Sequence, residues 1–229
     1  MTFSLPSPDC PLCPRLAAFR AANRSQFPSF FNAPVPPFGE LSAGLLIVGL
    51  APGLKGANRT GRPFTGDYAG LVLYSSLAKY GFAEGTYNPE NVRPEAQGKG
   101  HKDLFTQATQ PDNFHLINCR ITNSVRCLPP ENKPETVEIK QCNGFLAKEI
   151  KAMPNLRVIL TLGLIAHKSV LMALGYKQSA FAFGHGAEHK LATITLLSSY
   201  HCSRYNINTG ALTQEMFDAV IDRARAALA

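Results

Sequence analysis

The chain reads LLIVGLAPGLKGANRTGRPFTGDYAG from residue 45 to residue 70, and this stretch predicts a buried strand that ends in a ligand-binding loop. The apolar run 45–48 suits a strand buried on both faces of a sheet. The loop after it is rich in residues that allow tight turns and close backbone approach to a ligand: Gly49, Pro52, Gly53, Gly56 and Gly61. A P-loop is excluded because Arg62 and Pro63, rather than Lys and Ser or Thr, follow the last of these glycines.

Strand and helix patterns alternate along the rest of the chain. Short β-rich runs at 45–48, 115–121, 157–162 and 191–197 are separated by helical patterns at 68–80, 134–153 and 164–174, and a last helix is predicted at 213–228. This order predicts a parallel sheet with helices on both faces. With 229 residues and no linker, the chain is expected to form a single α/β domain over residues 1–229. The polar stretch 83–102 is predicted to be a long surface excursion.

Charge and hydropathy narrow the class of protein. The net charge of +7 favours a polyanionic partner without requiring one. The sequence has no apolar segment of roughly 18 residues, and residues 1–13 lack the pattern of a signal peptide. We therefore expect a soluble, cytoplasmic protein.

Four cysteines form two pairs and suggest a metal centre. Cys10 and Cys13 lie in a CPLCP turn, and Cys127 and Cys142 bracket a longer segment. In a cytosolic chain such thiols indicate metal binding rather than disulfides. Zinc ribbons usually repeat the close spacing, whereas iron–sulfur clusters tolerate scattered ligands. Cys119 lies in an apolar run and is predicted to be a core residue.

A third motif follows the last predicted strand. Residues 198–206 read SSYHCSRYN, and Thr209 and Gly210 come shortly before a helix. In parallel α/β sheets, loops at the carboxyl ends of strands bind ligands. This loop is therefore a candidate ligand-binding loop.

These motifs together resemble the uracil-DNA glycosylase superfamily, and more narrowly its type B, or family 5, branch. Residues 49–52 match GLAP, residues 56–67 match GxNRTGRxFTGD, and the third motif resembles HPSxxNxxTGxLT with Cys202 in place of proline. The resemblance extends from residue 10 to residue 213. It implies a three-layer α/β/α sandwich with a central, mostly parallel four-stranded sheet. It also implies a four-iron, four-sulfur (4Fe-4S) cluster held by Cys10, Cys13, Cys127 and Cys142.

The function implied by this resemblance is that of a monofunctional DNA glycosylase of base excision repair. Such an enzyme flips a base out of the helix and hydrolyses its N-glycosidic bond, here that of uracil and also of hypoxanthine or other deaminated bases, leaving an abasic site. It would act on DNA as a monomer. No lyase step is indicated, because Lys55 lies in a glycine-rich loop without apolar surroundings that would lower its pKa.

Each implied catalytic residue also has a plainer interpretation. His201 would donate a hydrogen bond to the departing base, although a lone loop histidine is more often structural. Phe64 would stack on the base, or it is a core residue. Asn123 would contact the pyrimidine edge, or it forms a turn. Other branches have an acid or amide just after the position of Gly49, where this chain has apolar residues, so Asp67 is the nearest candidate for water activation, or it caps a helix.

The remaining candidates concern binding. The expected substrate-binding residues are Gly49, Leu50, Ala51, Pro52, Asn58, Phe64, Ser203 and Arg204, and the expected phosphate contacts are Arg59, Arg62, Arg126 and Arg204. The cluster is expected to brace the segment 126–141 against DNA. Two alternatives stay open, namely a catalytically inactive iron–sulfur protein that binds nucleic acid and a zinc-bound structural or RNA-processing protein.

Overall fold

The computed structural model describes residues 4–89 and 113–229. Part of the predicted surface excursion, residues 90–102, lies outside these ranges. Within the described residues the strands are β1 (Leu45–Gly49), β2 (Ala83–Glu84), β3 (His115–Leu116), β4 (Cys119–Asn123), β5 (Val158–Leu162), β6 (Glu188–Leu191) and β7 (Ile194–Ser199). The α-helices are α1 (Pro14–Gln26), α2 (Ala57–Thr60), α3 (Tyr68–Lys79), α4 (Thr136–Ala152), α5 (Leu164–Ala173), α6 (Arg204–Asn208) and α7 (Gln214–Ala226). Two short 3-10 helices, η3 (Pro130–Asn132) and η4 (Gln178–Ala180), complete the described elements.

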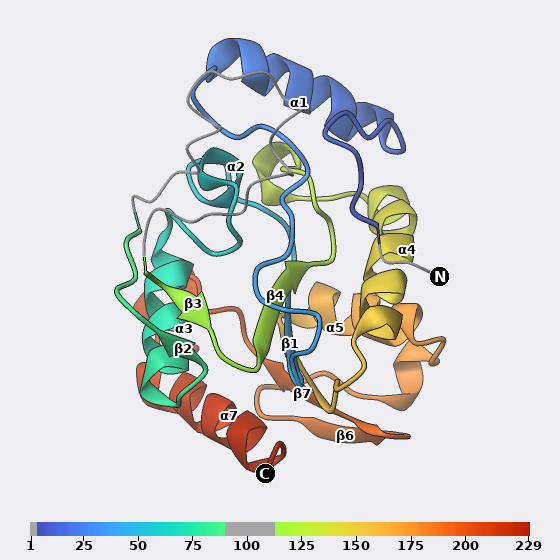
Figure 1. Ribbon diagram of the computed structural model, residues 1–229. Coiled ribbons are helices and arrows are strands. Elements are labelled where there is room, and N and C mark those ends of the chain that lie inside the picture. Colours follow the sequence, from blue (N-terminus) through green and yellow to red (C-terminus); the bar gives the residue numbers. More distant parts are fainter. Residues whose placement is uncertain (1–3, 90–112) are drawn as a thin grey trace.

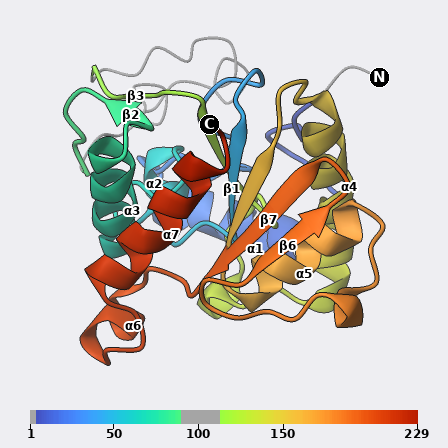
Figure 2. The same cartoon turned by 90° about the horizontal axis from the view of Figure 1, so that it is seen from below.

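The central sheet is the middle layer of an α/β/α sandwich. Its strand order is β4-β1-β5-β7-β6, and only the β6–β7 pair is antiparallel. Helices α3 and α7 lie on one side of the sheet and α4 and α5 on the other (Figures 1 and 2). This arrangement confirms the predicted α/β/α class and its mostly parallel sheet.

The number of strands differs from the prediction, because the sheet has five strands rather than four. The run 115–121 is interrupted at Asn118, whose φ of 48° is left-handed, so β3 pairs with β2 in a separate small sheet and only β4 joins the main one. The run 191–197 contains a hairpin turn at Ala192, with φ of 50°. This turn separates the antiparallel edge strand β6 from β7.

The two faces of the sheet bury alternate residues of each strand, as the two-residue period of a strand requires. Leu45 and Ile47 of β1 face the layer of α3 and α7, whereas Leu46 and Val48 face the layer of α4 and α5. All residues of β1 are buried, which is the expected state of a central parallel strand.

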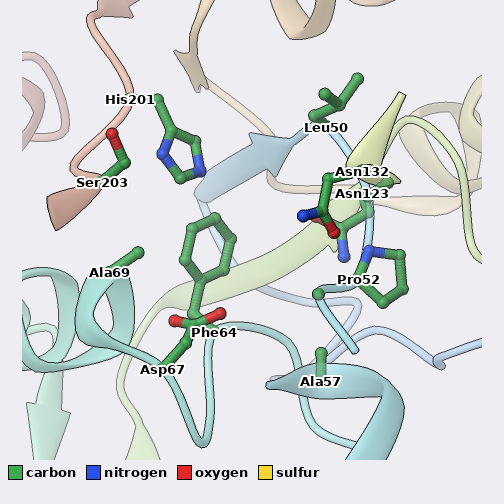
Figure 3. Close-up of a pocket in the computed structure, with 12 residues that line it drawn as sticks. Leu50, Pro52, Ala57, Phe64, Asp67, Ala69, Asn123, Asn132, His201 and Ser203 are labelled. Carbon is green, nitrogen blue, oxygen red and sulfur yellow. The ribbon is translucent and has the colours of Figure 1, made fainter. Parts of the chain in front are cut away.

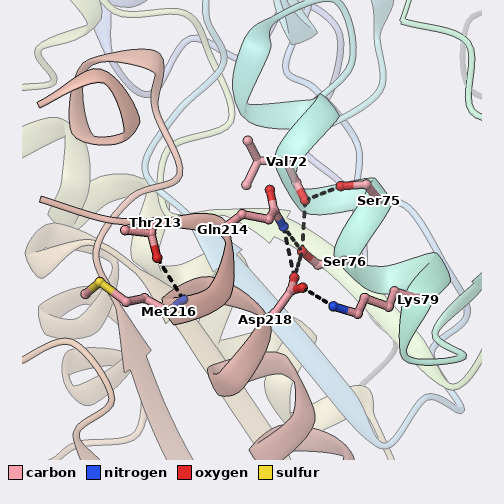
Figure 4. Close-up of polar contacts among 8 residues, drawn as sticks. All are labelled: Val72, Ser75, Ser76, Lys79, Thr213, Gln214, Met216 and Asp218. Carbon is pink, nitrogen blue, oxygen red and sulfur yellow. Dashed lines mark hydrogen bonds and ion pairs between the residues drawn. The ribbon is translucent and has the colours of Figure 1, made fainter. Parts of the chain in front are cut away.

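Helices α3 and α7 are joined by a buried polar contact (Figure 4). Asp218 Oδ1 accepts hydrogen bonds from Ser76 Oγ at 2.6 Å and from Gln214 Nε2 at 2.9 Å, and its Oδ2 accepts one from Lys79 Nζ at 2.6 Å. Every carboxylate oxygen of this buried acid therefore has a partner. Because α3 follows the first motif and α7 follows the third, this contact links the two segments that approach the site.

No helix in residues 4–89 and 113–229 is long and apolar enough to cross a bilayer.

Candidate active site

A cavity of about 320 Å³ opens where β1, β4 and β7 end. Loops from all three sequence motifs surround it (Figure 3). Its volume falls in the range of small-ligand pockets. The lining residues are Leu50, Ala51, Pro52, Gly53, Ala57, Phe64, Asp67, Ala69, Asn123, Asn132, His201 and Ser203.

Phe64 lies in the middle of the pocket and also belongs to the buried core of the α3 and α7 layer, so the core interpretation is confirmed. Its φ of 54° is left-handed, a conformation that costs about 1–2 kcal/mol for a residue other than glycine. Gly70 allows this turn, because a Cβ there would come within 1.7 Å of the carbonyl oxygen of Phe64. The Tyr87 hydroxyl donates to the same carbonyl at 3.2 Å.

The loop that carries Phe64 is anchored by Arg62, which is only 1% exposed. The guanidinium lies 5.3–6.0 Å from the ring centroids of four aromatic residues, Phe38, Tyr74, Tyr87 and Phe114. Its Nε donates to Thr65 Oγ1 at 2.8 Å. The expectation that Arg62 contacts phosphate is therefore wrong, since this cation is held among aromatic rings inside the protein.

His201 follows β7 and faces the Phe64 ring, with ring centroids 6.0 Å apart and an interplanar angle of 26°. Burial lowers the pKa of His201 below its ordinary value, and the nearby Asp67 carboxylate opposes this shift. The imidazole is therefore neutral near pH 7 and can donate one N–H. The Asn206 side chain donates to the backbone carbonyl of His201 at 2.8 Å and fixes the loop. Cys202, which replaces the family's proline, is fully buried in the core.

The structure confirms that Asp67 caps a helix, and the same residue lines the cavity. It is the N-cap of α3, with Oδ1 accepting from the backbone N–H of Gly70 at 3.2 Å. It also lines the cavity (Figure 3). Gly56 makes room for it, because a Cβ there would lie 2.5 Å from Asp67 Oδ2.

Two amide side chains face the cavity. Asn123 ends β4 and is 4% exposed, and it was predicted from the sequence. Asn132, in the 3-10 turn η3, was not predicted, because a PENK segment is typical of any surface turn. Its φ of 57° is left-handed, a conformation that asparagine tolerates better than most residues. The sequence alone does not show that Asn132 adopts this conformation. Both amides belong to the cavity lining.

Some predicted binding residues lie apart from the cavity or have structural contacts. Asn58 is buried and donates from Nδ2 to Asn32 Oδ1 at 2.9 Å, outside the cavity lining. Gly49 does not line the cavity either, but its backbone packs against the side chains of Phe64 and Asn123. Ser203 lines the cavity and caps α6 by accepting from the Asn206 N–H at 3.3 Å.

The two remaining arginines at this end of the protein are closer to solvent. Arg204 is exposed, and its guanidinium lies 5.3 Å from the ring centroid of Tyr68. Arg59 donates from Nε to the Lys55 carbonyl at 2.9 Å. Arg204 therefore stays a candidate phosphate contact outside the cavity.

The four paired cysteines line one second cavity. Cys10 lies in the N-terminal turn, Cys13 is the N-cap of α1, Cys127 follows β4 and Cys142 lies in α4. The other lining residues are mostly apolar: Pro6, Leu12, Leu16, Pro34, Val125, Arg126 and Phe145. No group of three or more His, Cys, Asp or Glu side chains among residues 4–89 and 113–229 is arranged to hold a single metal ion.

Two buried arginines direct N–H groups toward this cavity or its cysteines. Arg20 Nη1 donates to Cys127 Sγ at 3.5 Å, and the backbone N–H of Arg126 donates to Cys142 Sγ at 3.4 Å. Arg20 Nε and the Nε and Nη1 of Arg126 are buried without a hydrogen-bond partner in the described part of the chain. An anionic group among the cysteines would be stabilised by these donors.

Arg126 is also wrong as a predicted phosphate contact, because it is 1% exposed. Its Nη2 donates to the buried Glu149 carboxylate. Glu149 also accepts from Arg120 Nε at 2.7 Å and from Thr122 Oγ1 at 2.9 Å. The carboxylate thus connects the cysteine cavity to β4, the strand that carries Asn123.

Comparison with known proteins agrees with this geometry. The profile described as the uracil DNA glycosylase superfamily matches residues 36–225. A type-5 uracil-DNA glycosylase of Thermus thermophilus is 39% identical over 222 residues, which cover 94% of this chain and 92% of that protein. A type-5 enzyme of Pyrobaculum aerophilum is 34% identical, covering 95% and 88% of the two chains. One of Mycobacterium bovis is 35% identical, covering 94% and 77%. The chain therefore belongs to the uracil-DNA glycosylase superfamily and, within it, to the type-5 branch.

Proposed function

We propose that this protein is a DNA glycosylase that removes uracil from DNA in base excision repair, as a monomer and without a lyase step. The observation that carries the proposal is the convergence of Phe64, Asp67, Asn123 and His201 on one cavity. One chain supplies all four side chains. The type-5 relatives are named uracil-DNA glycosylases.

In the proposed mechanism, the flipped uracil stacks on Phe64 and its polar edge faces the amide of Asn123. The bond between the sugar C1′ and the base N1 breaks, and its electron pair leaves with the base. The neutral imidazole of His201 donates its N–H to the uracil oxygen on which this negative charge develops. Stabilisation of the leaving base is then the main catalytic contribution of the side chains.

Water completes the reaction at C1′. The water oxygen forms a bond to the cationic sugar carbon, and the proton that it loses passes through solvent to the uracil anion. The products are an abasic sugar and neutral uracil. Asp67 is the acidic residue of the cavity lining, so its carboxylate would steady the sugar cation or orient the water. Leu50 and Ala51 can do neither, because their side chains are apolar.

We also propose that hypoxanthine and other deaminated bases are substrates. Small or apolar side chains at Leu50, Ala51, Gly53 and Ala57 line the cavity, and none of them carries a polar group that would reject a larger base. We therefore expect the shape of the pocket to admit bases larger than uracil. The amide side chains of the pocket would then provide most of the selectivity between bases.

The four cysteines around the second cavity are proposed to hold a 4Fe-4S cluster. Their common cavity and the unpartnered donors of Arg20 and Arg126 fit an anionic cluster. Bound there, the cluster would cross-link the N-terminal turn, the segment after β4 and α4. The bound cluster would thereby restrain the residues between Cys127 and Cys142.

A single-turnover assay on duplex DNA with one uracil tests the activity, with strand cleavage at the abasic product as the readout. Wild-type protein should release uracil and His201→Ala should be strongly impaired. Iron and sulfide analysis tests the cluster separately. Cys127→Ala should lose both elements, whereas Cys119→Ala, which changes a buried core thiol, should retain them. Uracil left intact by iron-loaded wild-type protein would favour the inactive nucleic-acid-binding alternative instead.

A further inference from the structure

The cavity contains a second amide at a different depth from the first. Asn123 is nearly buried at the end of β4, whereas Asn132 is exposed, so the two amides occupy the floor and the rim of the same pocket. In Figure 3 both lie to the right of the Phe64 ring, and His201 lies above the ring and to its left. Both amides line the cavity, so each is within reach of a ligand bound there.

The backbone holds Asn132 in a defined position. Its N–H donates to the Pro129 carbonyl at 3.1 Å, and the N–H of Lys133 donates to the Pro130 carbonyl at 2.9 Å. Glu131 and Asn132 both have left-handed φ values, of 54° and 57°. Two consecutive residues in this conformation are uncommon and cost energy, which is consistent with a turn built to place a side chain.

The floor amide is close to the stacking ring. A Cβ at Gly49 would lie 2.5 Å from Asn123 Oδ1 and 2.8 Å from Phe64 Cζ, so amide and ring both press against the same backbone position. A one-ring base on Phe64 would therefore fill the space next to Asn123. A two-ring base on the same platform would extend further toward the rim.

We propose that Asn132 is a specificity-determining residue that hydrogen-bonds purine-sized deaminated bases, typified by hypoxanthine. Hypoxanthine carries an N–H donor next to a carbonyl acceptor, and an asparagine amide offers the complementary acceptor and donor. Uracil has the same pattern on a smaller ring, which Asn123 reads at the floor. This inference rests on the proposed glycosylase function and names the residue that extends its substrate range.

The test compares two substrates in one sequence context. Single-turnover rates are measured on duplexes with either uracil or hypoxanthine at the same position. Asn132→Gly removes the amide but permits the left-handed backbone. Glu131→Gly is the matched control, because it makes the same backbone change at an adjacent exposed residue outside the cavity.

Asn132→Gly should lower the hypoxanthine rate by about tenfold, the loss expected for one hydrogen bond, while uracil release stays within about twofold of wild type. Glu131→Gly should leave both rates within about twofold. Affinity for DNA with a tetrahydrofuran abasic analogue should not change in either variant, because that DNA has no base to contact.

Other results overturn the inference in distinguishable ways. Equal losses on both substrates together with weaker binding to the tetrahydrofuran DNA would assign Asn132 to the DNA backbone. Unchanged rates on both substrates would remove any role for its amide. Wild-type protein that releases uracil but not hypoxanthine would refute the purine contact and the wider substrate range together, and wild-type protein inactive on both would refute the proposed glycosylase function itself.

Discussion

Replacing Gly49 with alanine should lower the rate of uracil release and leave the stability of the fold nearly unchanged. Gly49 ends β1, and an added Cβ would lie 2.5 Å from Asn123 Oδ1 and 2.8 Å from Phe64 Cζ, whereas ordinary contacts begin near 3.4 Å. The amide oxygen must therefore retreat by about 1 Å and the ring edge by somewhat less. A misplacement of about 1 Å in an active site can cost about 10²-fold in rate, so single-turnover uracil release should fall by about that factor.

The fold should tolerate this change. The Asn123 amide can rotate and the Phe64 ring can shift toward the cavity that it lines, and alanine in a strand avoids the entropic cost of glycine, which is about 0.5–1 kcal/mol. We expect the free energy of unfolding, measured with urea, to stay within about 1 kcal/mol of wild type. Gly144→Ala in α4 is the control, because a Cβ there would meet nothing within 4 Å, and it should leave the rate unchanged. A wild-type rate for Gly49→Ala would refute the assignment of Asn123 and Phe64 to the base site.

Five further changes test the site and the fold. His201→Ala should lower the single-turnover rate by about 10²-fold or more, as loss of an oxyanion donor does. Asp67→Asn should keep the melting temperature, since asparagine caps helices as well, and a lower rate would show that the charge itself is needed. His167 is a buried residue of α5 whose ring nitrogens lie 2.9 Å from Ser198 Oγ and 2.9 Å from the Phe181 carbonyl oxygen. Burial lowers its pKa, so the stability that its neutral form contributes is present above about pH 6.5 and is lost on acidification. The urea-measured stability gap between wild type and His167→Asn should therefore narrow from about pH 8 to pH 5. Arg204→Ala should make the plot of log DNA affinity against log salt shallower by roughly one phosphate contact, and an unchanged slope would place this arginine away from DNA. Asp218→Ala, which leaves the α3–α7 contact incomplete, should cost about 1–3 kcal/mol in thermal or urea unfolding with little effect on the rate.

The α/β/α fold was predictable because hydrophobic period and chain order largely determine it. The strand of residues 45–48 and the cap at Asp67 were both found from local pattern. The errors arose where an apolar run contains a hidden turn. Asn118 and Ala192 adopt left-handed conformations inside such runs, and neither is a glycine that would have signalled a break. Helix α1 was not predicted, because the cysteines and prolines at its start were interpreted as a metal-binding turn.

The site was predictable where a motif identifies it and unpredictable where burial decides the role. His201 and Asn123 line the cavity as expected from their motifs. Arg62 and Arg126 were assigned to phosphate because sequence shows charge but not exposure. Asn132 was missed because its contribution depends on two left-handed residues in a turn, which no local pattern of residue types encodes.

The left-handed backbone at Phe64 fixes the direction in which the side chain leaves the main chain. Gly70 and the Tyr87 hydroxyl hold the carbonyl of residue 64, so the direction of its side chain is set by main-chain contacts rather than by the ring. Tyrosine, histidine or tryptophan at this position would leave the backbone along the same vector. Under the stacking role proposed for Phe64, a series of such variants would vary the π-surface beneath the base, and their rates would compare stacking energies at one position of an enzyme.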